Sequence, residues 1–247
     1  MFRHSLESKF YYKTFFHSFL LSFLAGNVNV GGFMACGRFV THVTGFATLF
    51  AIDVAHQSWS IALGILSVPF YFLLGTMLSA YLVDRRIHQG KQGGYVLVMG
   101  LITLCFSLVI VGGSQGWFGY FGEGVNLEQD YLLLALLCGA SGLQNAAITT
   151  SSGAVIRTTH LTGITTDLGI GLMKLIFYPS TQSPEQRTRE MRINFLRIIT
   201  IGAFILGGCV GAVLYLKYEY KAFLLPATIS FYAMIASSSI RVPGVRE

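Results

Sequence analysis

Long apolar runs separated by short polar segments dominate the chain. Two further apolar segments are shorter or more polar: about 45–57, which contains Asp53 and His56, and about 163–178, which contains Asp167 and Lys174. A helix needs roughly 20 mostly apolar residues to cross the hydrocarbon of a bilayer. Six runs meet or approach this length, and they cover about 14–36, 59–83, 94–113, 131–150, 195–216 and 222–240. The pattern predicts an all-α membrane protein, a polytopic helix bundle.

The basic residues between these runs predict the orientation. Lys and Arg gather in the N-terminal tail, in 84–93, in 179–197 and in the C-terminal tail, whereas 113–130 contains acidic residues and no Lys or Arg. Because Lys and Arg favour the cytoplasmic side, the four basic segments are expected inside and 113–130 outside; Lys217 and Lys221 are the exception. This arrangement requires that the two short segments do not cross. We therefore expect about six full transmembrane helices plus two re-entrant or half-helix segments, in a single domain over residues 1–247 with both termini cytoplasmic.

Composition supports the same class. Hydrophobic residues make up 53% of the chain and charged residues 11%, with a mean hydropathy of +0.61. A soluble domain carries roughly 25% charged residues, so a soluble protein is excluded. The net charge of +6 lies in the segments between apolar runs and does not indicate nucleic acid. The four cysteines lack metal-ligand spacing, and we expect no metal and no cofactor.

A five-residue motif occurs twice. Thr41-His42-Val43-Thr44-Gly45 recurs as Thr159-His160-Leu161-Thr162-Gly163, an offset of 118 residues (159 − 41 = 118), and the same offset pairs Asn27 with Asn145. Arg38 and Arg157 precede the two copies. The duplication divides the chain into repeat 1, about 14–113, and repeat 2, about 131–240. Each repeat holds three full spans, an odd number, which predicts two inverted three-helix repeats, as in many secondary transporters.

The residue types of the motif suit a solute site. Gly45 and Gly163 are expected to take backbone angles that other residues resist, and Thr44 and Thr162 are expected to cap new half-helices. Helix N-termini and arginines favour negative charge, and histidines titrate near neutral pH. The predicted substrate-binding residues are Asn27, Arg38, Thr41, His42, Thr44, Gly45, Asn145, Arg157, Thr159, His160, Thr162 and Gly163. Asp53 and Asp167 are the predicted coupling or gating residues. The structural alternative is that these polar side chains tie broken helices together and that the carboxylates lie at an aqueous boundary.

The second motif also indicates a family. Gly142-Leu143-Gln144-Asn145, followed by the segment from Arg157 to Gly163 and by Thr166-Asp167, together with the segment from Gly37 to Gly45, resembles the YoaK-like family of uncharacterised bacterial membrane proteins. The resemblance covers most of the chain. It implies a bacterial inner membrane and about six spans, and it implies no activity.

We therefore expect a secondary transporter or membrane binding protein for a small polar solute, more anionic than cationic, at the repeat interface. The alternatives are a membrane scaffold or assembly protein whose polar motif is structural, and a membrane-embedded enzyme. No catalytic motif supports an enzyme, and we expect none. Membrane lipid is an expected partner, and a homodimer is compatible with the sequence.

The predicted topology can be tested by cysteine labelling in intact cells. A cysteine at Gln115 should react with an impermeant thiol reagent from outside, and one at Gln89 should react only after the inner face is exposed. The reverse pattern at either position would contradict the proposed orientation.

Overall fold

The computed structural model describes residues 11–41, 43–123, 127–152, 160–177 and 183–238, with side chains of 11–14, 127–129 and 152 excepted. These residues form helices and no strand. The elements are α1 (Tyr11–Cys36), α2 (Thr44–Ala55), α3 (Trp59–Ile65), α4 (Ser67–His88), α5 (Tyr95–Ser114), α6 (Leu127–Ser152), α7 (Leu161–Phe177), α8 (Pro184–Tyr218), η1 (Glu219–Phe223) and α9 (Leu224–Ser238). The fold is the all-α polytopic bundle that the apolar pattern predicts.

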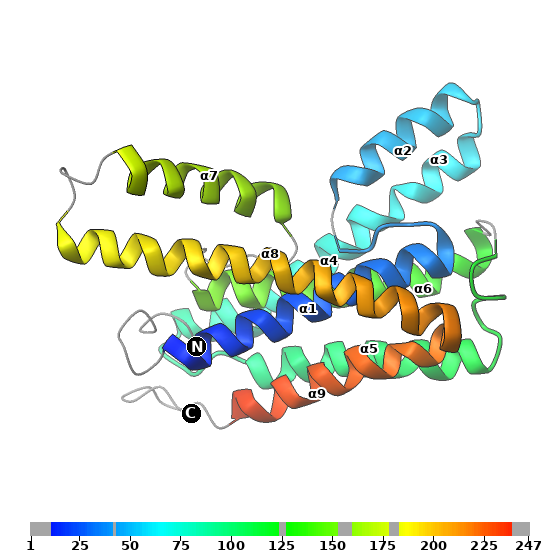
Figure 1. Cartoon of the computed structure of the whole chain (residues 1–247). Helices are drawn as coiled ribbons and strands as arrows, with labels where there is room; N and C mark the ends of the chain where they lie inside the picture. The colour runs from blue at the N-terminus through cyan, green and yellow to red at the C-terminus, as the bar shows by residue number, and fades with distance from the viewer. Residues whose placement is uncertain (1–10, 42, 124–126, 153–159, 178–182, 239–247) are drawn as a thin grey trace.

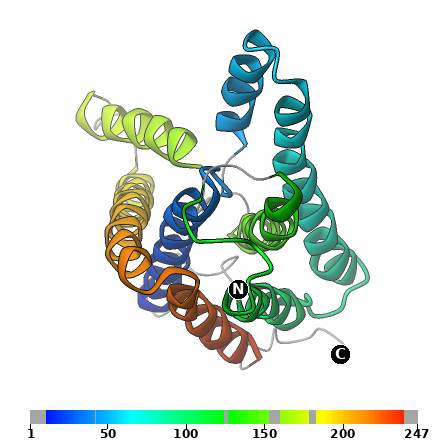
Figure 2. The ribbon, with the colours of Figure 1, turned by 90° about the vertical axis from the view of Figure 1, so that its right-hand side faces the viewer.

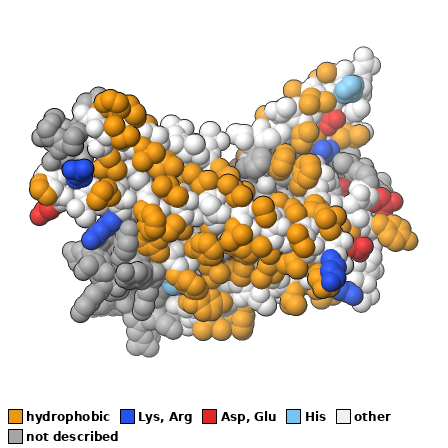
Figure 3. Space-filling model, in the orientation of Figure 1, with side chains coloured by type: hydrophobic (Ala, Val, Ile, Leu, Met, Phe, Trp, Pro, Cys, Tyr) orange, Lys and Arg blue, Asp and Glu red, His pale blue; other side chains and the backbone are white. Residues whose placement is uncertain are grey.

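Five apolar helical stretches in the described part of the chain are long enough to cross a membrane. The last, Pro184–Ser238, contains α8, η1 and α9. Figure 1 shows that the chain turns back at η1, so this stretch passes through the bundle twice. The bundle therefore has six passes, which run in alternating directions. Hydrophobic side chains cover much of the face shown in Figure 3, as expected of a surface that contacts lipid.

Helices α2 and α7 do not run the length of the bundle. They contain 12 and 17 residues, and α2 has no buried residue. Helix α2 packs against α3, and α7 packs against α8. In Figures 1 and 2 the N-terminal ends of both helices lie near each other at the centre of the molecule, and the helices extend toward opposite ends. These are the two half-helix segments expected from the sequence.

Helices α3 and α4 together form one pass with a local break. Leu66 separates the two, and Pro69 lies in the first turn of α4. Proline is tolerated there because the first-turn N–H groups have no partner within the helix. The pass therefore continues to His88 without losing an internal hydrogen bond at the proline.

Helices α1 and α8 touch at the backbone. A Cβ placed on Gly26 of α1 would overlap the carbonyl oxygen of Phe204 on α8, and a Cβ on Gly207 of α8 would overlap the carbonyl oxygen of Phe23 on α1. Small residues allow membrane helices to approach this closely, and van der Waals contact then drives their association. Glycine is required at both positions because any side chain would separate the helices.

Helices α4 and α6 repeat this reciprocal contact. A Cβ on Gly142 of α6 would overlap the carbonyl oxygen of Phe72 on α4, and a Cβ on Gly75 of α4 would overlap the carbonyl oxygen of Gly139 on α6. The first helix of repeat 2 therefore packs on α4 of repeat 1, as α1 packs on α8. This exchange of partners is what a two-fold relation between the repeats produces.

The contacts also define the structural register of the repeat. Residues 23 and 26 of α1 correspond to residues 139 and 142 of α6 (142 − 26 = 116), and residues 72 and 75 of α4 correspond to residues 204 and 207 of α8 (207 − 75 = 132). The first-helix offset is 116, not the 118 of the motif. Asn145 therefore corresponds to Asn29, and the predicted pairing of Asn145 with Asn27 is wrong. The segment between α6 and the second motif is therefore two residues longer than the segment between α1 and the first motif.

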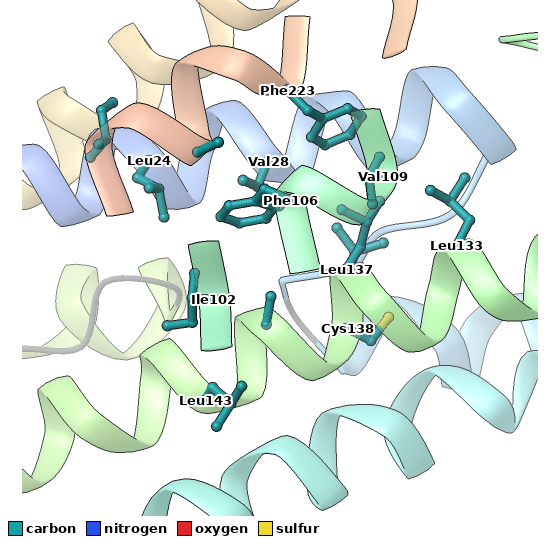
Figure 4. Packing of buried hydrophobic residues seen from close by; sticks show 14 of the residues in the cluster. Leu24, Val28, Ile102, Phe106, Val109, Leu133, Leu137, Cys138, Leu143 and Phe223 are labelled. Atoms are coloured by element: carbon teal, nitrogen blue, oxygen red, sulfur yellow. The ribbon is translucent and has the colours of Figure 1, made fainter. Parts of the chain in front are cut away.

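An apolar core lies where α1, α5, α6 and the η1 turn meet. Figure 4 shows residues of this cluster, with Phe106 of α5 and Phe223 of η1 among them. Their rings are stacked with centroids 6.4 Å apart. The labelled side chains of this cluster are Leu24, Val28, Ile102, Phe106, Val109, Leu133, Leu137, Cys138, Leu143 and Phe223. The core fixes the third pass of repeat 1 between the two close helix pairs.

Helix α8 begins earlier than the apolar run at 195 indicates. Ser183 caps it, with the Ser183 hydroxyl accepting from Gln186 N–H and the Gln186 side chain accepting from Ser183 N–H. Pro184 at the first helical position suits this start. The polar segment after Pro184 is therefore continuous with the membrane pass.

The close α1–α8 contact predicts a position-specific sensitivity on α8. Gly207→Ala should lower the free energy of unfolding by about 1–3 kcal/mol, because the added methyl group overlaps the Phe23 backbone. Gly202→Ala is the matched control, since a Cβ there has no atom within 4 Å. Unfolding of the purified variants in detergent measures both. Equal stability of the two variants would contradict the close helix contact.

Candidate functional site

A cavity of about 330 Å³ lies between α4, α6 and the start of α7. This volume is within the range typical of small-molecule sites. Six of its eight lining residues have polar side chains, although most of the lining surface itself is apolar. The lining residues are Thr76, Ala80, Asp84, Asn145, Ala146, Thr149, Thr150 and His160. The structure thus brings together two predicted site residues, Asn145 and His160, from different parts of the second motif.

Asn145 and His160 are hydrogen-bonded. Asn145 Nδ2 lies 3.2 Å from His160 Nε2. This contact joins α6 to the residue that precedes α7.

The Gly-Leu-Gln-Asn segment has three separate contacts that explain its residue types. Gly142 lies against the α4 backbone. Gln144 is buried and donates from Nε2 to the carbonyl oxygen of Leu21 on α1 at 2.8 Å. Asn145 contacts His160. The segment thus connects α6 to α4, α1 and α7 within four residues.

Four polar residues of the cavity were not among the predicted site residues: Thr76, Asp84, Thr149 and Thr150. Thr76, Ala80 and Asp84 are spaced four apart and share one face of α4. Thr76 and Asp84 are eight positions apart, which is about 12 Å along the helix. Asp84 is half-buried near the end of α4, and it is the charged residue of the described lining. In the sequence, Asp84 directly precedes Arg85 and Arg86, so the pattern places it in the basic segment 84–93 and not in the site.

The first motif is arranged differently. Thr41 is buried and donates from its hydroxyl to Asn29 Oδ1 at 2.8 Å. Asn29 therefore contacts the first motif as its counterpart Asn145 contacts the second. Asn27 instead lies in the α1–α8 contact, where it accepts from Tyr215 and donates to the carbonyl oxygen of Gly207. Asn27 does not line the cavity described above.

Two details of the predicted helix starts are wrong. Val43 is the N-cap of α2 and has no side-chain capping bond, whereas Thr44 is the first helical residue. Thr162 lies inside α7, and its carbonyl oxygen accepts from the Thr166 hydroxyl. Neither Gly45 nor Gly163 has a positive φ, since both lie within helices; the left-handed residue next to the first motif is Gly37, with φ of +66°. The turn after α1 thus requires glycine four residues before Thr41.

The remaining predicted residues are spread over the structure. Arg38 is half-buried between α1 and α2, Asp53 is half-buried on α2, and Asp167 is exposed on α7. His42, Arg157 and Thr159 lie outside the described residues. Among the described residues no group of three or more His, Cys, Asp and Glu side chains could hold a metal ion.

Comparison with known families adds one finding. A family described as "protein of unknown function (DUF1275)" matches residues 17–236, which include both motifs and both helix pairs. The chain belongs to the DUF1275 family. This agrees with the uncharacterised membrane-protein family that the motifs resemble. Neither a curated protein nor a solved structure matches this DUF1275 chain significantly.

Proposed function

We propose that this DUF1275 protein binds a small polar solute in the cavity between α4, α6 and α7 and moves it across the membrane as a secondary transporter. The observation that carries the proposal is the polar lining of this cavity. Polar side chains within membrane helices are costly and are usually functional. A site between inverted repeats, next to a half-helix, is also where such transporters bind their solutes.

Comparison of the two helix pairs supports a functional role for part of this polar lining, whereas Thr76 also donates to the carbonyl oxygens of Phe72 and Gly142 at the helix contact. The equivalent positions of α1 and α8 follow from the offsets of 116 and 132 set by the glycine contacts. The polar residues Thr76, Asp84, Thr149 and Thr150 correspond in this way to Gly208, Leu216, Phe33 and Met34. The α1–α8 pair therefore makes the same close backbone contact with apolar or small residues at these positions. Binding of a polar ligand accounts for the difference.

The charge of the lining favours a neutral or cationic solute. Asp84 supplies a carboxylate, and the described lining contains no Lys or Arg. The Thr76 hydroxyl already donates to the Phe72 carbonyl oxygen, so it can accept from a solute; the hydroxyl groups of Thr149 and Thr150 and the Asn145 amide supply further polar atoms. The anion expected from Arg38 and Arg157 has less support, because Arg38 does not line this cavity and Arg157 lies outside the described residues.

The orientation belongs to the same proposal. Asp84 is near the end of α4 that leads to Arg85, Arg86 and Lys91. By the positive-inside rule this end faces the cytoplasm. The cavity then opens toward the cytoplasm of a bacterial inner membrane, and Thr76 lies at its deep end.

Thermal unfolding of the purified protein tests the site. Wild type, Asp84→Asn and Asp167→Asn are heated with a panel of small neutral, cationic and anionic solutes. A ligand that binds only the native state stabilises it by RT ln(1 + [L]/Kd), about 2.7 kcal/mol at a hundredfold excess over Kd. We expect a neutral or cationic solute to stabilise wild type and Asp167→Asn, with most of the effect lost in Asp84→Asn.

Asp167 is the matched control because it is an exposed carboxylate on α7 that does not line the cavity. Stabilisation by anions alone, unchanged in Asp84→Asn, would contradict the proposed solute class. A folded wild type that no solute stabilises would favour the scaffold alternative, in which the polar residues are structural.

A further inference from the structure

A polar cluster lies on α8 beneath α7. Arg197 donates from Nη1 to Asn194 Oδ1 at 2.7 Å, and the same nitrogen lies 3.4 Å from Glu190 Oε1. Asn194 is 3% exposed, and the Arg197 side chain is 18% exposed. These residues are spaced three and four apart and form one stripe of the helix. The cluster belongs to neither duplicated motif and does not line the solute cavity.

Two N–H donors of this cluster have no acceptor within the described residues. They are Asn194 Nδ2 and Arg197 Nε, and both atoms are buried. Helix α7 presents Gly171 here, packed directly on the Asn194 and Arg197 side chains, so it has no side chain that could accept. Buried donors in native proteins almost always have a partner. Because both atoms are covered, the group of this cluster that an acceptor outside the described chain can reach is the partly exposed guanidinium of Arg197.

The surrounding charges favour an acceptor that is an anion. Lys174 is exposed on α7 one turn after Gly171, and Arg189 is exposed on α8 before the cluster. Glu190 offsets one of these positive charges, and Asp167 is the exposed carboxylate of α7 nearest to Gly171 in sequence. Figure 3 shows basic side chains at the end of the molecule where α8 begins, next to hydrophobic side chains. Guanidinium groups bind phosphate particularly well because they present several N–H donors in one plane.

The apolar residues beside the cluster favour a lipid over a free ion. Exposed side chains of α7 and α8 flank the polar stripe, and acyl chains can cover them: Ile170, Met173 and Ile176 on α7, and Met191, Phe195 and Ile198 on α8. We infer that the phosphate of an anionic phospholipid binds at the seam between α7 and α8, on the partly exposed guanidinium of Arg197, which Asn194 positions through its hydrogen bond.

The depth of the cluster agrees with a headgroup site. Helix α8 has 35 residues, which is about 52 Å of helix, whereas the hydrocarbon is about 30 Å thick. Arg197 lies 21 residues before Tyr218, about 32 Å along the helix. If Tyr218 marks one membrane boundary, Arg197 lies at the other. Basic pockets between membrane helices at this level are suited to anionic headgroups.

Lipid binding can be measured by native mass spectrometry of the detergent-purified full chain. Phosphatidylglycerol, phosphatidylcholine and inorganic phosphate are each added to wild type, Arg197→Gln, Asn194→Leu and Arg187→Gln. We expect one phosphatidylglycerol to remain bound to wild type in preference to phosphatidylcholine. Its affinity should fall about tenfold in Arg197→Gln and Asn194→Leu. Arg187→Gln, which removes an exposed charge of the same helix, should bind as wild type does.

Three outcomes would overturn the proposal. Equal losses in Arg197→Gln and Arg187→Gln would mean that α8 attracts lipid by its overall charge. Equal retention of both lipids would mean that no headgroup site exists. Phosphate binding that excludes phosphatidylglycerol would mean that the site takes a free ion. If Arg197→Gln does not fold, Asn194→Leu decides, because it removes the group that positions Arg197 and leaves the charge.

Discussion

Backbone contact between helices at glycine is the constraint on which the rest of the structure depends. In α1–α8 and in α4–α6, each helix places a glycine against a carbonyl of its partner. Because these partners come from different repeats, the two contacts join the repeats into one bundle. Asn27 reinforces the first contact by accepting from Tyr215 and donating to the Gly207 carbonyl. The half-helices α2 and α7 then start from fixed positions, each just after the first helix of its repeat.

The two repeats share their backbone contacts but differ in the residues at the cavity. The two helix pairs make the same backbone contact, but only the α4–α6 pair carries a carboxylate and threonines where its counterpart is apolar. The asparagines Asn29 and Asn145 keep a common role, since each contacts the motif of its own repeat. The shared glycine contacts give the two helix pairs a common frame, and the cavity residues distinguish one pair from the other.

Most of the fold was predictable because hydrocarbon thickness dictates the length of apolar runs, and the six passes and two half-helices follow from that pattern. The site was predicted only in part. Asn145 and His160 come from the second motif, but Asp84 has the appearance of a loop residue beside Arg85, and its α4 face meets α6 only through long-range packing. The motif offset of 118 pairs Asn145 with Asn27, whereas the helix contacts pair it with Asn29. The segment between the first helix and the motif is two residues longer in repeat 2, and only the glycine contacts reveal this difference. The extension of α8 to Pro184 depends on a capping box, which apolar periodicity does not reveal.

The most direct test of the proposed function is uptake of labelled small polar solutes into sealed proteoliposomes that contain the wild-type protein. The account predicts time-dependent accumulation of a neutral or cationic solute above that of protein-free vesicles, with saturation at high solute concentration and strong reduction in the Asp84→Asn variant. A solute that binds the protein but never enters the vesicles would contradict the transport claim and leave a membrane binding protein. Accumulation that is equal for wild type and Asp84→Asn would contradict the assignment of the cavity as the solute site.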